Sequence, residues 1–107
     1  MNTDQLLEHH AKLTRAAAAL MRRKNSDYAG KDGTRPFRNF ELCEAMNLCR
    51  TEVGMAVRLS DKIQRLAGAL SSDGTFQVSD ETFDDTVLDA INYLILISAH
   101  RKQQGKP

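Results

Sequence analysis

The sequence is poor in the residues that mark zinc-binding, secreted and membrane proteins. Its two cysteines, Cys43 and Cys49, lack CxxC spacing and a nearby histidine cluster, which argues against a zinc site or a disulfide framework. We interpret both as small buried thiols in a reducing compartment. The longest apolar run, residues 16–21, is six residues long, whereas a bilayer span needs roughly 20. The first five residues do not resemble a signal peptide, so we expect a cytoplasmic protein.

An excess of charge of one sign is also missing. The formal net charge is +1, so the sequence does not suggest binding to duplex DNA. Proline occurs only at Pro36 and Pro107, and tryptophan is absent. Long helices can therefore run uninterrupted around an aliphatic, alanine-rich core. The length of 107 residues predicts a single domain, residues 1–107.

The spacing of apolar residues predicts an all-α fold, a small bundle of three long helices and one short helix. Thr3 or Asn2, Thr51 and Ser79 are candidate caps of the long helices. The expected elements are long helices over about 3–25, 51–71 and 80–102, a short helix over 38–46, and an extended piece over 76–78. Segment 25–40 contains two glycines and a proline and is predicted to be a long functional loop after the first helix.

Each of the last two long helices carries a polar stripe. Within about 80° of helical arc in the last helix lie Glu81, Asp85, Asp89 and Asn92, bordered by Tyr93. Within about 100° in the third helix lie Arg58, Asp61, Lys62 and Arg65. The expected core face of the third helix is Val53, Ala56, Val57, Ser60, Ile63, Ala67 and Leu70, and that of the last helix is Phe83, Val87, Ala90, Ile91 and Leu94. If the two helices pack antiparallel, the basic stripe can face the acidic one.

Two interpretations of the stripes stay open. In the structural one, buried ion pairs fix the register of the helices. In the functional one, Arg58, Lys62 and Arg65 hold phosphates, while Glu81, Asp85 and Asp89 bind a divalent metal or polar ligand groups. The sequence contains no GxSxG, Walker or HExxH motif, and its three histidines lack metal-ligand spacing, so no complete catalytic motif is evident.

Four segments in order, residues 24–28, 36–40, 57–66 and 80–93, resemble a family of small phage and prophage proteins described as nucleotide-modification-associated domains. The resemblance covers about residues 20–98. A fainter similarity is to MazG-like all-helical nucleotide pyrophosphohydrolases, which bind magnesium through ExxE and ExxD motifs. The matching pairs here are Glu41 with Glu44 and Glu81 with Asp84. A whole expected helix separates these pairs, and Asp84 lies outside the stripe that contains Glu81.

The resemblance implies a protein of the bacterial host cell that binds a phosphorylated, nucleotide-type ligand. Our first hypothesis is a sponge that sequesters a cyclic nucleotide or ADP-ribose-type immune signal and needs no cofactor. The alternatives are a metal-dependent pyrophosphohydrolase or other nucleotide-metabolism enzyme, for which we expect Mg²⁺, and a protein-binding inhibitor or assembly module. A homo-oligomer is expected because one small core buries little surface. The expected ligand site comprises Lys24, Asp27, Tyr28, Arg35, Phe37, Asn39, Phe40, Arg58, Lys62, Arg65, Asn92 and Tyr93.

Overall fold

The computed structural model of the protein confirms the all-helical class. It describes residues 1–28, 33–71 and 82–107, apart from the side chains of residues 26–28. Within these ranges there are four helices and no strand: α1 (Thr3–Tyr28), α2 (Arg38–Ala45), α3 (Thr51–Ser71) and α4 (Phe83–Gln103). The extended piece expected at 76–78 and the cap expected at Ser79 lie outside the described residues. None of the described helices combines the length and apolar character needed to cross a membrane.

Four helix ends differ from the sequence-based expectation. The first helix continues to Tyr28, α2 ends at Ala45, and α4 begins at Phe83 and ends at Gln103. A capping box defines the start of α4: the Asp85 N–H donates to Thr82 Oγ1 at 3.1 Å, and the Thr82 N–H donates to Asp85 Oδ2 at 3.0 Å. This reciprocal pair satisfies two backbone groups that would otherwise lack partners. Thr82, rather than Ser79, therefore caps the helix.

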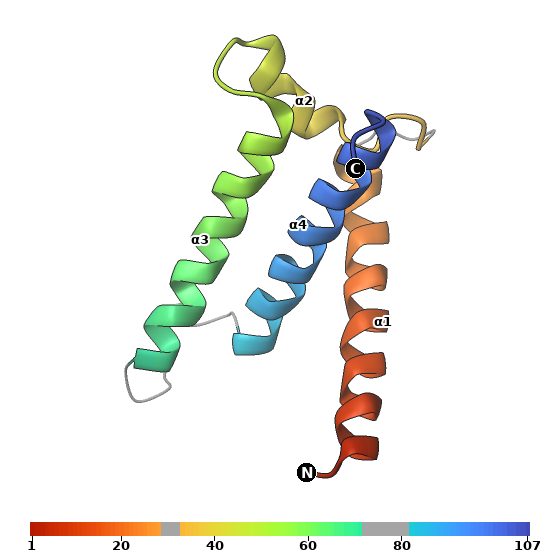
Figure 1. The fold of residues 1–107 in the computed structure, drawn as a ribbon, viewed down its shortest axis with the longest axis vertical. Helices are drawn as coiled ribbons and strands as arrows, with labels where there is room; N and C mark the ends of the chain where they lie inside the picture. Colours follow the sequence, from red (N-terminus) through yellow and green to blue (C-terminus); the bar gives the residue numbers. More distant parts are fainter. Residues whose placement is uncertain (29–32, 72–81) are drawn as a thin grey trace.

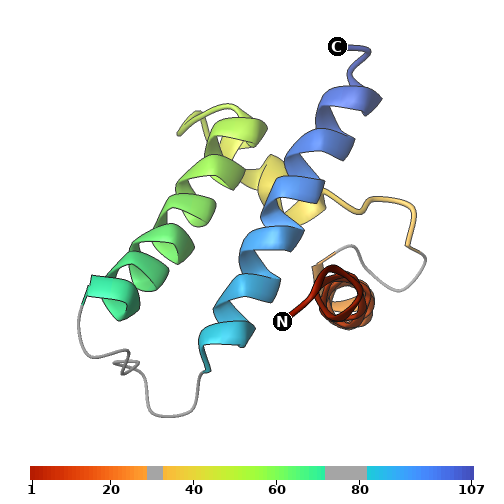
Figure 2. The same ribbon diagram turned by 60° about the horizontal axis from the view of Figure 1, so that its bottom comes forward.

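The central element is α4, because both other long helices pack against it. Figures 1 and 2 show α3 and α1 on different sides of α4, with α2 crossing near the start of α3. The main core cluster, Phe37, Phe40, Met55 and Tyr93, lies where α2, α3 and α4 meet. This corner places the end of α4 opposite the start of α3.

The predicted core face of α3 is wrong. Val53, Val57, Ile63 and Leu70 are 39%, 61%, 51% and 74% exposed, whereas Met55 is fully buried. This helix carries a second apolar line through Met55, Leu59 and Ala69, and that line faces the interior. Helical periodicity identifies both lines but contains no information about which one finds a partner.

The predicted core face of α4 is partly wrong. Ala90 is buried and Val87 and Ile91 are half-buried, as expected, but Phe83 and Leu94 are 38% and 56% exposed. The more polar side of α4 turns inward instead, and Asn92 and Tyr93 are buried. This orientation follows from the position of α4 between two helices, since the side facing both α1 and α3 is the side that carries Asp89, Asn92 and Tyr93.

The two cysteines lie together at the corner between α2 and α3. Their Sγ atoms are 3.5 Å apart, and both thiols are free and half-buried. Burial raises the pKa of the Cys43 thiol, which keeps it protonated and unreactive near neutral pH. A Cβ atom at Gly54 would lie 2.9 Å from Cys43 Sγ, so glycine at this position allows α2 to approach the first turn of α3.

Candidate functional site

One carboxylate, Asp89, joins all three long helices. Its Oδ1 lies 3.1 Å from Lys24 Nζ on α1, and its Oδ2 lies 3.1 Å from Lys62 Nζ on α3. The Asp89 and Lys62 side chains are 12% and 18% exposed, and Lys24 is 42% exposed. The basic stripe of α3 therefore does face the acidic stripe of α4 at this point. Because each carboxylate oxygen has its own ammonium partner, Asp89 acts as an inter-helix bridge.

The neighbouring polar side chains are also bound within the protein. Arg58 Nε donates to Tyr93 Oη at 2.9 Å, and the guanidinium lies 5.8 Å from the centre of the Tyr93 ring. Phe40 packs edge-on against the same ring. Asn92 Nδ2 donates to the carbonyl of Ala17 at 3.0 Å, while its buried Oδ1 has no partner. These contacts hold α3, α2 and α1 against α4.

The space beside this cluster is small. A cavity of about 30 Å³ lies next to Lys24, Phe40, Asp89, Asn92 and Tyr93. This volume is about that of one water molecule, whereas pockets for small ligands hold roughly 300–1,000 Å³. The Asp89 cluster, as folded, has the geometry of a structural ion-pair network.

The three residues expected to bind metal do not form a described cluster. Asp85 is part of the capping box. Two hydrogen bonds with Thr82 lower the Asp85 pKa: the bond to the Thr82 backbone N–H has the larger effect, and the bond to its hydroxyl has the smaller one. Asp89 bridges the two lysines, and Glu81 lies outside the described residues. In the described ranges no three histidine, cysteine, aspartate or glutamate side chains are grouped so that they could hold a metal ion.

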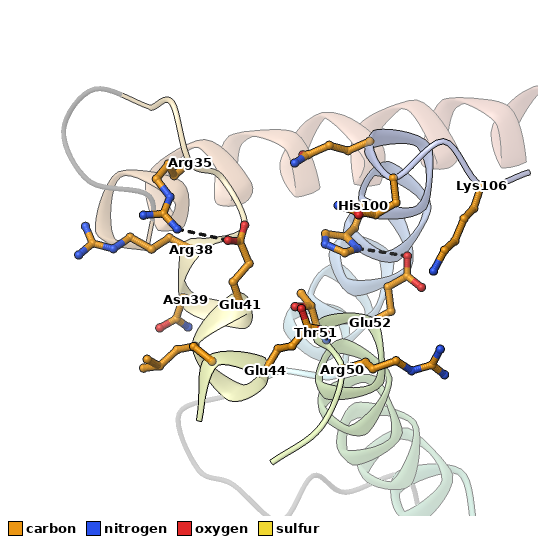
Figure 3. A pocket seen from close by; sticks show the side chains of 14 residues that line it. Arg35, Arg38, Asn39, Glu41, Glu44, Arg50, Thr51, Glu52, His100 and Lys106 are labelled. Atoms are coloured by element: carbon orange, nitrogen blue, oxygen red, sulfur yellow. Dashed lines mark hydrogen bonds and ion pairs between the residues drawn. The ribbon is translucent and has the colours of Figure 1, made fainter. Parts of the chain in front are cut away.

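A much larger pocket, of about 820 Å³, opens at the other end of α4. We call it the α2–α3–α4 pocket, because the residues before and in α2, the start of α3 and the end of α4 form its walls. Figure 3 shows Arg38 and Asn39 on the α2 side, Thr51 near the centre, and His100 and Lys106 on the opposite side. Its volume lies in the range of pockets that hold nucleotides and similar ligands.

The acidic side chains that line this pocket already have partners. Glu41 Oε2 lies 3.3 Å from Arg35 Nη2, and Glu44 Oε1 accepts the Thr51 N–H at 3.2 Å. Glu52 Oε1 lies 3.1 Å from His100 Nδ1. This hydrogen bond is the main cause that lowers the Glu52 pKa, so this carboxylate stays ionised well into the acid range.

Three cations on the same pocket remain available. Arg38, Arg50 and Lys106 line the cavity, and none of their side chains has an ion pair or hydrogen bond in the described part of the chain. With Arg35, the pocket has four cationic side chains against the three carboxylates of Glu41, Glu44 and Glu52, which leaves a net charge of +1 with His100 neutral. Such a site attracts a phosphate or carboxylate.

Thr51 provides a further polar group at the centre of the pocket. It is the first residue of α3 and is 1% exposed, yet its Oγ1 has no hydrogen-bond partner. A buried hydroxyl without a partner costs about 1–3 kcal/mol, so an acceptor or donor supplied by a ligand would remove this cost. The positive end of the α3 dipole lies at the same place, where the Glu44 carboxylate already accepts the Thr51 N–H.

The structure divides the expected ligand residues between these two places. Arg35 and Asn39 line the α2–α3–α4 pocket, and Phe37 packs edge-on against His100 behind it. Lys24, Phe40, Arg58, Lys62, Asn92 and Tyr93 belong to the Asp89 cluster. Arg65 lies further along α3 and pairs with Asp61 at 3.4 Å. The side chains of Asp27 and Tyr28 are outside the described residues.

The sequence analysis missed the residues that distinguish the large pocket. Thr51 was predicted only as a helix cap, and this role is wrong, because it is the first residue of α3 and its hydroxyl has no hydrogen-bond partner. Arg50 and Lys106 were assigned no role. No family model, curated protein or solved structure matches the chain.

Proposed function

We propose that this protein binds a phosphorylated, nucleotide-type small molecule in the α2–α3–α4 pocket and sequesters it unchanged. The single observation that carries the proposal is the buried, unpartnered Thr51 hydroxyl at the centre of a pocket of about 820 Å³. Arg38, Arg50 and Lys106 surround it. On binding, the side chains that cover the Thr51 hydroxyl move aside, a phosphate oxygen accepts from it, and the cations neutralise the charge of the phosphate.

The pocket also contains groups suited to the rest of a nucleotide. Asn39, Gln103 and Gln104 line it with side-chain amides. Each amide offers both a donor and an acceptor, which match the edges of a nucleobase or the hydroxyls of a ribose. A cyclic nucleotide or an ADP-ribose-type signal combines these polar edges with phosphate.

The unpartnered Thr51 hydroxyl argues against covalent catalysis through this residue. A hydroxyl nucleophile needs a general base in hydrogen-bond contact. His100 lines the same pocket and is paired with Glu52, but the Thr51 hydroxyl has no hydrogen-bond partner, His100 included. The resemblance to nucleotide-associated phage proteins supports the same ligand class, and a sponge for an immune signal is the corresponding biological role.

The test combines ligand binding with chemical recovery of the ligand. The full-length protein is incubated with 3′,5′-cyclic mononucleotides, cyclic dinucleotides and ADP-ribose, with and without Mg²⁺. Binding is measured by calorimetry, and the ligand is released by heat and identified by mass spectrometry. We expect one class to bind and to be recovered intact. Products that appear only with Mg²⁺ would overturn sequestration in favour of hydrolysis, and failure of every compound to bind would overturn the proposed function.

Thr51→Val is the sharpest variant, because it removes the hydroxyl and keeps the shape of the side chain. We expect affinity to fall about tenfold or more, as for a hydrogen bond to a charged group. Stability should not fall, because the hydroxyl has no partner to lose. Arg65→Gln is the matched control on α3, outside the pocket. If Arg65→Gln or Lys62→Met abolishes binding and Thr51→Val does not, the ligand site is the basic stripe of α3 instead.

A further inference from the structure

The outer face of α3 carries a regular apolar stripe. Its members follow one another at intervals of three and four residues and all are exposed: Val53, Ala56, Ser60, Ile63, Ala67 and Leu70. This spacing is the heptad pattern with which one helix packs along another. The stripe runs along a helix of 21 residues, which is about 31 Å long. It continues over the 18 residues from Val53 to Leu70, about two and a half heptads, without a charged residue.

The neighbouring positions on the solvent side of the stripe are also neutral. They are Val57, Gln64 and Ser71. Arg58, Asp61, Lys62 and Arg65 lie on another side of the helix, where Asp61 pairs with Arg65; Glu52, at the start of the stripe, is already paired with His100 and Arg101. Figures 1 and 2 show α3 at one edge of the molecule, with α4 beside it. A helix could therefore pack against the stripe without desolvating a charge.

The accessible surface of the chain is large for its mass. It measures 7785 Å², whereas a compact monomer of 12.0 kDa should expose about 6,000 Å². The excess of about 1,800 Å² exceeds the roughly 800 Å² per partner that a standard protein–protein interface buries. Burial of about 800 Å² on each copy of a dimer would remove nearly half of this excess.

We infer that two copies of this protein form a dimer by antiparallel packing of their α3 stripes. In this register Val53 faces the Leu70 position of the other copy, Ala56 faces Ala67, and Ser60 faces Ile63. A large residue thus meets a large one at each end, two alanines meet next to them, and Ser60 meets Ile63 at the centre. The same six positions serve both copies, as a two-fold symmetric interface requires.

The first experiment measures the mass of the full-length protein in solution by light scattering over a range of concentrations. We expect a dimer, and we expect Ile63→Lys to convert it into a monomer with unchanged helical content, since Ile63 is 51% exposed in the single chain. Leu94→Lys is the matched control on α4, at 56% exposure, and should remain dimeric. A monomeric wild-type protein overturns the inference, as does a dimer that Ile63→Lys leaves intact.

The second experiment tests the register and does not depend on Ile63→Lys folding. Ala56→Cys protein is mixed with Ala67→Cys protein and oxidised mildly, and the cross-links are mapped by peptide mass spectrometry. Antiparallel pairing predicts a covalent bond between the two different variants. Bonds within each variant alone would indicate parallel pairing, and no bond between the introduced thiols would place the interface elsewhere. Nucleotide binding by Ile63→Lys, measured separately, distinguishes failure of the dimer from failure of the proposed ligand site.

Discussion

Replacing Asp89 with asparagine should unfold the protein at a markedly lower denaturant concentration. The substitution keeps the size and shape of the side chain but removes the negative charge between Lys24 and Lys62. Both ammonium groups lie 3.1 Å from the carboxylate. Lys62 is 18% exposed, so water can replace little of the lost interaction. Lys24, at 42% exposure, can be solvated much more easily.

The expected loss follows from these exposures. A hydrogen bond to a charged group contributes about 1.5–3 kcal/mol when it is shielded from water, which applies to Lys62. A pair exposed like Lys24 contributes at most about 1 kcal/mol. Asp89→Asn should therefore lower the free energy of unfolding by about 2–3 kcal/mol. For a domain of this size the melting temperature should fall by roughly 10–20 °C.

The assay is urea unfolding followed by circular dichroism, and its control is a second substitution. Lys62→Met in the Asp89→Asn background removes the ammonium left without a partner, so the double variant should be more stable than Asp89→Asn alone. Asp61→Asn, at a 58% exposed ion pair, should change stability by less than about 0.5 kcal/mol. The ion-pair account is refuted if Asp89→Asn unfolds like the wild type, or if Lys62→Met lowers stability further. Asp89→Asn should still bind the ligand, because Asp89 does not line the α2–α3–α4 pocket.

Three further substitutions test other parts of the fold. Met55→Ala should cost about 2–5 kcal/mol in urea unfolding, since Met55 is fully buried, and a loss below about 1 kcal/mol would show that the core can close around the gap. Thr82→Ala removes the α4 capping box and should cost about 1 kcal/mol, with faster amide exchange confined to the first turn of α4; protection that stays unchanged there would contradict this role. The Glu52 pKa is lowered in the folded protein, mainly by the hydrogen bond with His100. The contribution of Glu52 to stability is therefore complete above the ordinary glutamate pKa of about 4.3. It is lost as the pH falls through the lower pKa of the folded protein. Glu52→Gln should therefore reduce the difference in unfolding free energy between neutral pH and about pH 3, and an unchanged difference would mean that other carboxylates account for it.

The helices themselves were predictable because their signals are local. Scarce proline, helical periodicity and capping residues indicate three long helices and a short one, and α3 starts at Thr51 and ends at Ser71 as expected. Partial burial of Asp89 and Asn92 was also predictable, since both polar residues lie within an apolar stretch. The predicted start of α4 was wrong, because several residues near it are suitable helix caps. The reciprocal hydrogen bonds between Thr82 and Asp85 determine which residue caps the helix.

The sequence by itself determined which segments are helical and which polar side chains need partners. Tertiary structure alone decided which of two apolar lines on α3 is buried, since both satisfy the same 3.6-residue period. It also decided that Lys24, 65 residues from Asp89 in the chain, shares that carboxylate with Lys62. The gathering of Arg50, Thr51 and Lys106 around one pocket is likewise a property of the fold. The physical reason is that helix formation depends on neighbours within a few residues, whereas the packing of helix faces depends on the summed burial and pairing of the whole chain.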